Sequence, residues 1–222
     1  MKKPRPNDEA VDVIVDLERL NGLQRMGRLH RQRGAQGDVL SFEYDRQWLI
    51  HPAMFQFDPD LLLGKGRIYA PAGRENFGIF LDSSPDRWGR LRMQRRAARR
   101  AAKQGKAAPA RTAWDFLLGV HDATRLGALR FRRSEEQPFL DDSDDLAAPP
   151  IARLQELQEV SWKLEHEHAE EDPDYDIWLA QLVAPGSSLG GARPKAAVID
   201  EQGCLCIAKF PSRQDTRDVG GW

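Results

Sequence analysis

The stretch Val11-Asp-Val-Ile-Val-Asp-Leu17 decides the fold, because apolar side chains alternate along it with Asp12 and Asp16 on the face opposite the valines. This alternation is typical of a β-strand with one buried face. Two more strands are predicted at Met26–His30 and Val39–Tyr44, on either side of a glycine-containing break. Paired strands therefore come first and helices follow, which predicts an α+β fold beginning with a small antiparallel β unit.

Capping residues mark two helix starts. Ser84-Pro85-Asp86 combines a capping serine, a proline at the first helical position and an acid in the first turn. The helix that it opens is predicted to run through an Arg- and Ala-rich stretch to about Gly105. Thr112–Asp115 resembles a capping box, with Asp in place of Glu, and predicts a short helix at Trp114–Gly119. A strand is predicted at Gly127–Arg132.

A domain boundary is predicted within Ser134–Pro150, which has few large apolar residues and ends in two prolines. The first domain is then residues 1–135, the linker 136–150 and the second domain 151–222. In the second domain, apolar residues recur at helical spacing from Ile151 to Leu164, and another helix is predicted from Asp172 through Trp178 and Leu182. Two strands, Ala196–Ile199 and Leu205–Phe210, predict a hairpin around a turn at 200–203.

Composition narrows the class of protein. The 222 residues include 33 basic and 34 acidic side chains, and the mean hydropathy is −0.61. These values exclude collagen-like, coiled-coil and generally disordered chains. No apolar run is long enough for a membrane helix, and the charged N-terminus lacks the apolar core of a signal peptide. Cys204 and Cys206 are poorly placed for a disulfide, which favours a reducing cytoplasm.

The near-zero net charge hides two charged blocks. Ten basic and no acidic residues lie between Arg87 and Arg111, whereas Asp141–Asp176 holds thirteen acidic residues and two basic ones. The basic block is open to two interpretations, a phosphate-binding surface or a solvated helix face. The acidic block offers it a counter-charge within the same molecule.

The strongest candidate for chemistry is a glycine-rich loop followed by a lysine strand. Pro185–Gly191 contains three glycines and two serines, which allow backbone N–H groups to approach an anion closely. Lys209 follows on the second strand of the predicted hairpin, as the strand lysine of protein kinases follows their phosphate loop. The glycines do not match G-x-G-x-x-G or a Walker A motif. The residues alone therefore leave nucleotide binding and an ordinary glycine loop both open.

No other cluster predicts chemistry. His166 and His168 stand two residues apart, which does not place them on one helix face, so no metal site is predicted. No Ser/His/Asp or Cys/His set occurs at a spacing that indicates a nucleophile and its base.

Three stretches resemble the HipA-type toxin Ser/Thr kinases. Pro185-Gly-Ser-Ser-Leu-Gly-Gly-Ala-Arg-Pro-Lys195, followed by Ile207-Ala-Lys-Phe-Pro211, is similar to their loop and lysine strand. Phe80-Leu-Asp-Ser-Ser-Pro-Asp-Arg-Trp-Gly-Arg90 and Trp114–Phe131 are similar to their N-terminal region. The three blocks occur in the family's order, and the resemblance covers the chain roughly from Val11 to its end.

The resemblance implies a fold, a cofactor and partners. Residues 151–222 would be a kinase-like N-lobe hairpin with helices, in a toxin of a type II toxin–antitoxin system that uses ATP and Mg²⁺. Such kinases phosphorylate a translation component such as an aminoacyl-tRNA synthetase. They are restrained by a HipB-like DNA-binding antitoxin, through which alone they reach DNA. By position in the motif, Ser188 would be the autophosphorylated serine and Ser187 a second choice. The implied ATP-binding residues are Gly190, Gly191, Ala192, Arg193, Pro194, Lys195 and Lys209.

The chain also departs from the family. It stops at Asp218–Trp222, before the glutamate partner of the strand lysine, the catalytic Asp and Asn and the metal-binding Asp. We therefore expect a truncated N-terminal part with no catalytic residue of its own and no kinase activity alone. One alternative is a stand-alone regulatory protein that docks on a separate HipA-like kinase core. Another is a nucleic-acid-binding protein that uses the block from Arg87 to Arg111.

Overall fold

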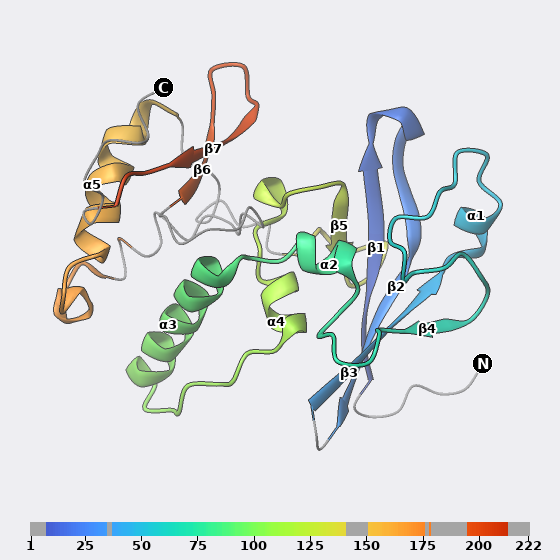
Figure 1. Ribbon diagram of the computed structural model, residues 1–222, viewed down its shortest axis with the longest axis horizontal. Coiled ribbons are helices and arrows are strands. Elements are labelled where there is room, and N and C mark those ends of the chain that lie inside the picture. The colour runs from blue at the N-terminus through green and yellow to red at the C-terminus, as the bar shows by residue number, and fades with distance from the viewer. Residues whose placement is uncertain (1–7, 35–36, 141–150, 176–177, 179–194, 213–222) are drawn as a thin grey trace.

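The computed structural model describes residues 8–34, 37–140, 151–175, 178 and 195–212. Its main feature is a five-stranded antiparallel sheet with strand order β4-β3-β2-β1-β5 (Figure 1). The strands are β1 (Asp8–Leu17), β2 (Gly22–Gly34), β3 (Gly37–Tyr44), β4 (Arg67–Tyr69) and β5 (Leu129–Arg132). This sheet and the helices packed with it confirm the predicted α+β fold and the three-strand meander at its centre.

Five α-helices lie within the described residues: α1 (Arg46–Leu49), α2 (Gly78–Asp82), α3 (Arg87–Lys103), α4 (Ala113–Leu118) and α5 (Leu154–Leu164). Short 3₁₀ turns occur at Glu18–Leu20, Asp122–Thr124, Ile151–Arg153 and Ala169–Glu171. None of the helices within the described ranges has the length and apolar character needed to cross a bilayer.

The main hydrophobic core lies on one face of the sheet. Val11, Val13 and Val15 of β1 are fully buried, as their alternation predicts. Phe80 of α2 and the Trp114 side chain of α4 belong to the same buried cluster. The sequence stretch that alternates most regularly therefore lies at the centre of the core.

The helix start near Ser84 differs from the prediction. Asp86 is the N-cap of α3, because its Oδ1 accepts the N–H of Gly89 at 2.8 Å. Ser84 is instead committed to the preceding helix, since its hydroxyl donates to the carbonyl of Phe80 at 2.7 Å. The predicted end of this helix is confirmed, because Gly105 lies just past the C-cap of α3 with a φ of +65°.

The capping box of α4 is confirmed. The N–H of Thr112 donates to the carboxylate of Asp115 at 2.9 Å, and the reciprocal bond from the Asp115 N–H to the threonine side chain is also present. These two bonds satisfy N–H groups that would otherwise have no partner in the first turn.

The second half forms a smaller unit around a hairpin of β6 (Lys195–Ile199) and β7 (Leu205–Lys209). Leu157 and Val160 of α5 pack against Ala196 and Val198 of β6, and this cluster shares no residue with the main core. At the hairpin turn, the carboxylate of Asp200 accepts the N–H groups of residues 202 and 204. The predicted hairpin is confirmed. The predicted boundary lies partly outside the described residues, and so does most of the helix predicted from Asp172.

Candidate functional site

Two of the predicted ATP-binding residues, Lys195 and Lys209, lie within the described residues. Gly190–Pro194 and both candidate phosphorylation sites, Ser187 and Ser188, lie outside them. The site can therefore be built from the hairpin and from what packs against it.

The hairpin has two faces with different roles. Ala196, Val198 and their neighbours on β7 pack against α5. Lys195 and Lys209 are direct partners in the antiparallel ladder, so their side chains leave the opposite face next to each other. The two lysines differ sharply in exposure, since Lys195 is buried and Lys209 is exposed.

Lys195 is paired with a carboxylate from a distant part of the chain. Its Nζ donates to Oδ2 of Asp86 at 3.0 Å, and the two side chains are 6% and 10% exposed. The same carboxylate caps α3 through Oδ1. The sequence marks Asp86 only as a helix-start residue, and no short-range pattern connects it to a lysine 109 positions away.

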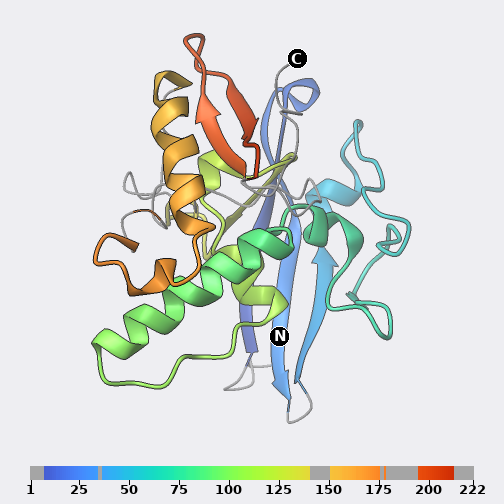
Figure 2. The ribbon, with the colours of Figure 1, turned by 60° about the vertical axis from the view of Figure 1, so that its left-hand side comes forward.

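The basic block is confined to α3 and the loop that follows it. Figure 2 shows the described residues that follow α5, 165–175, beside α3. Arg95 of α3 donates to the hydroxyl of Tyr175 at 3.1 Å, and the guanidinium of Arg99 lies 4.6 Å from the centre of the same ring. Tyr175 is fully buried and belongs to the acidic block. Two arginines of the basic block therefore contact a tyrosine that lies within the acidic block, one through a hydrogen bond and one through a cation–π contact.

A surface groove of about 580 Å³ lies at the N-terminal end of α3, next to the Asp86–Lys195 ion pair. Its basic members are Arg87, which is exposed, and Arg90, which donates to Glu75 at 2.8 Å. The lining residues are Pro85, Asp86, Arg87, Arg90, Leu91 and Gln94.

The two stretches that resemble the N-terminal region of the kinase family pack against each other. Arg125 is buried, and its guanidinium donates to the carbonyls of Ser83, Leu117 and Val120 at 3.2, 2.6 and 2.8 Å. Ser83 belongs to the first stretch and the other residues to the second. The arginine thus joins them into one unit next to the start of α3.

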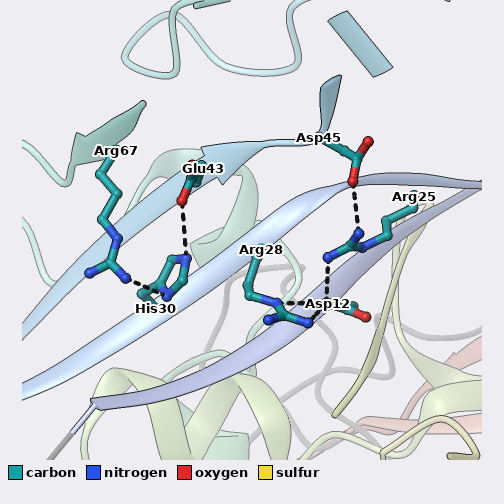
Figure 3. A network of polar contacts seen from close by, with 7 residues as sticks. All are labelled: Asp12, Arg25, Arg28, His30, Glu43, Asp45 and Arg67. Carbon is teal, nitrogen blue, oxygen red and sulfur yellow. Dashed lines mark hydrogen bonds and ion pairs between the residues drawn. The ribbon is translucent and has the colours of Figure 1, made fainter. Parts of the chain in front are cut away.

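A polar network covers the sheet face opposite the core (Figure 3). Asp12 is buried beneath two arginines of β2, with its Oδ1 3.1 Å from Arg25 and 2.8 Å from Arg28. Arg25 also bridges to Asp45, the N-cap of α1, at 2.8 Å. Asp12 is therefore on the predicted face but is not solvated, because the two guanidinium groups cover it.

His30 belongs to the same network. Its Nδ1 lies 3.2 Å from a guanidinium nitrogen of Arg67, and its Nε2 lies 3.8 Å from Glu43. Burial, first, and then the positive charges of Arg67 and Arg28 together lower the pKa of His30 to about 4. The imidazole is therefore neutral at physiological pH. Its contacts join β2 to side chains of β3 and β4 on this face of the sheet.

Among the described residues, no group of three or more His, Cys, Asp or Glu side chains is arranged to hold a metal ion. Both cysteines are free thiols, with Cys204 exposed and Cys206 half-buried.

In comparisons with known proteins, no family model and no curated protein matches this sequence.

Proposed function

We propose that this chain is the N-terminal part of a HipA-like Ser/Thr kinase of a toxin–antitoxin system, with a hairpin that holds the phosphates of ATP. The observation that carries the proposal is the ladder pairing of Lys195 with Lys209. Residue 194 is the last of the glycine-rich stretch and is bonded directly to Lys195. The stretch therefore ends one residue from the strand partner of Lys209.

The exposed lysine has the properties of a phosphate ligand. Lys209 lies on the hairpin face that α5 does not cover, at the end of β7. A lysine ammonium is a compact point charge suited to phosphate oxygens, and kinases place one on a strand beside their phosphate loop. Lys195, by contrast, has its charge balanced by Asp86. Lys209 is thus the residue to which we assign the main phosphate contact.

In this proposal the residues of this chain hold the phosphates of ATP, which is one of the two tasks that phosphoryl transfer requires. When bound, ATP and Mg²⁺ supply the transferable phosphoryl group and its charge neutralisation. The proposal assigns metal binding and the orientation of the attacking hydroxyl to a catalytic lobe outside this sequence. The substrate class carried over from the resemblance is a translation component such as an aminoacyl-tRNA synthetase, and the partner is a HipB-like antitoxin.

The proposal is tested by titrating ATP into the full chain and its variants by calorimetry. Half a nucleotide cleft should bind weakly, with a Kd of about 0.1–1 mM, or roughly 4–5.5 kcal/mol. Lys209→Ala should weaken binding about fivefold or more, since it removes the exposed charge. Lys65→Ala is the matched control, because Lys65 is an exposed lysine of the first unit. Equal ATP affinity in wild type and Lys209→Ala, or micromolar binding by both, would contradict the proposal.

A further inference from the structure

The carboxylate of Asp86 serves two groups at once. Its Oδ1 accepts the N–H of Gly89 and caps α3, whereas its Oδ2 accepts from the ammonium of Lys195. The two oxygens therefore connect the start of a helix in the first unit to the first residue of β6 in the second. The ion pair requires the negative charge, whereas the cap can be kept without it, because a neutral asparagine oxygen caps a helix about as well.

The ion pair involves the strand neighbour of Lys209, the residue assigned above to the main phosphate contact. Lys195 directly follows the glycine-rich stretch and is the ladder partner of Lys209. Its side chain is 6% exposed and that of Asp86 is 10% exposed, so water screens the attraction between them only weakly. An anion next to Lys209 therefore approaches a lysine whose charge is already balanced.

We infer that Asp86 is a resident counter-ion that competes with phosphate for Lys195, and so is a positioning residue that lowers the affinity of this site for nucleotide. The inference rests on the proposed function. Phosphate gains the full attraction of Lys195 only by taking the place of the Asp86 carboxylate. The cap on Gly89 uses the other oxygen, so α3 keeps its start when the exchange occurs.

The test separates the charge of Asp86 from its cap. Asp86→Asn keeps an oxygen for the Gly89 N–H and removes the charge that holds Lys195. Asp45→Asn is the matched control, because Asp45 caps α1 through the N–H of Gln47 and pairs with Arg25 in the same way. ATP and inorganic triphosphate are titrated into each full-length variant by calorimetry, so that adenine contacts are distinguished from phosphate contacts.

The expected result is that Asp86→Asn binds both ligands about 3–10-fold more tightly than wild type, whereas Asp45→Asn binds them as wild type does. The double variant Asp86→Asn/Lys195→Met should return to within about twofold of wild type, because the cation and its counter-ion are both removed. This double variant removes both charges of the Asp86–Lys195 ion pair, so it also serves if the single variant, in which the ammonium of Lys195 has lost that carboxylate, fails to fold.

Unchanged or weaker binding by Asp86→Asn would overturn the inference. A several-fold loss of ligand affinity in the double variant, relative to wild type, would also overturn it. Lys195 would then attract phosphate in the wild type despite the Asp86 carboxylate. If Lys209→Ala still weakens ATP binding in either case, the proposed function stands and the competition alone is wrong. If Lys209→Ala has no effect either, both fail.

Discussion

The sheet network predicts a specific loss of stability in acid, through His30. Protonating this side chain places a positive charge between Arg67 and Arg28 in a position that is 12% exposed. Glu43 and Asp8 face it as well, but burial and the two arginines outweigh them and lower its pKa from 6.5 to about 4. The unfolded chain therefore takes up this proton before the folded chain does, and stability falls as the pH falls from 6.5 towards 4.

The size of the effect follows from the two pKa values. Each tenfold difference in proton affinity between folded and unfolded states is worth about 1.36 kcal/mol. At about pH 7.5, protonation of His30 costs the folded state almost no free energy of unfolding. The loss in free energy of unfolding reaches about 2 kcal/mol by about pH 5 and about 3 kcal/mol below pH 4.

Denaturant unfolding at about pH 7.5 and about pH 5 measures this loss. His30→Gln is the variant to compare, because its amide can accept from Arg67 and donate to Glu43 without titrating. Wild type should lose about 2 kcal/mol more than His30→Gln between the two pH values. Arg67→Gln should lose less than wild type, since one of the charges that oppose protonation is gone. If wild type and His30→Gln lose the same free energy of unfolding, the assignment of a neutral, buried imidazole is wrong.

Three further outcomes are expected. Arg125→Met should lower the free energy of unfolding by about 3–5 kcal/mol, because it leaves buried carbonyls without their donor. The control Arg33→Met, at an exposed arginine, should lower it by less than about 1 kcal/mol. Equal effects of the two variants in denaturation curves would count against a structural role of Arg125. Gly27→Ala should cost about 1–3 kcal/mol, since a Cβ there would lie 2.3 Å from the carbonyl oxygen of Glu43, while Gly64→Ala meets no atom within 4 Å; unfolding of both variants checks this. The isolated chain, incubated with labelled ATP, Mg²⁺ and a candidate synthetase, should transfer no phosphate, and turnover above a Lys209→Ala control would refute that expectation.

Local patterns predict those parts of the fold whose partners are close in sequence. The capping box needs only Thr112 and Asp115, three residues apart, and its geometry is as predicted. The hairpin turn likewise depends on Asp200 bonding to N–H groups two and four residues later. The strand alternation of β1 places its valines in the core because the side-chain period of a strand is two.

Contacts between distant segments are outside the reach of such patterns. The alternation of β1 places Asp12 on the correct face but cannot show that Arg25 and Arg28 of the next strand cover it. Ser84 has the residue type of a helix cap, yet the end of α2 takes its hydroxyl and leaves Asp86 as the cap. The pairing of Asp86 with Lys195 depends on how the two units pack. The sequence therefore indicates a helix-start residue and an ATP-binding lysine, but not the ion pair that joins them.

The most direct test of the proposed kinase assignment is to join residues 1–222 to the catalytic lobe of a HipA-type kinase, incubate the product with ATP and Mg²⁺, and map its phosphosites by mass spectrometry. A phosphate-holding loop would bring its own serine within reach of the transferred group, and a phosphate there adds about −1.5 to −2 charge. The proposal predicts phosphate on Ser188, with Ser187 as second choice, and loss of this modification in Lys209→Ala. An active graft that modifies neither serine and keeps its activity in Lys209→Ala would contradict it.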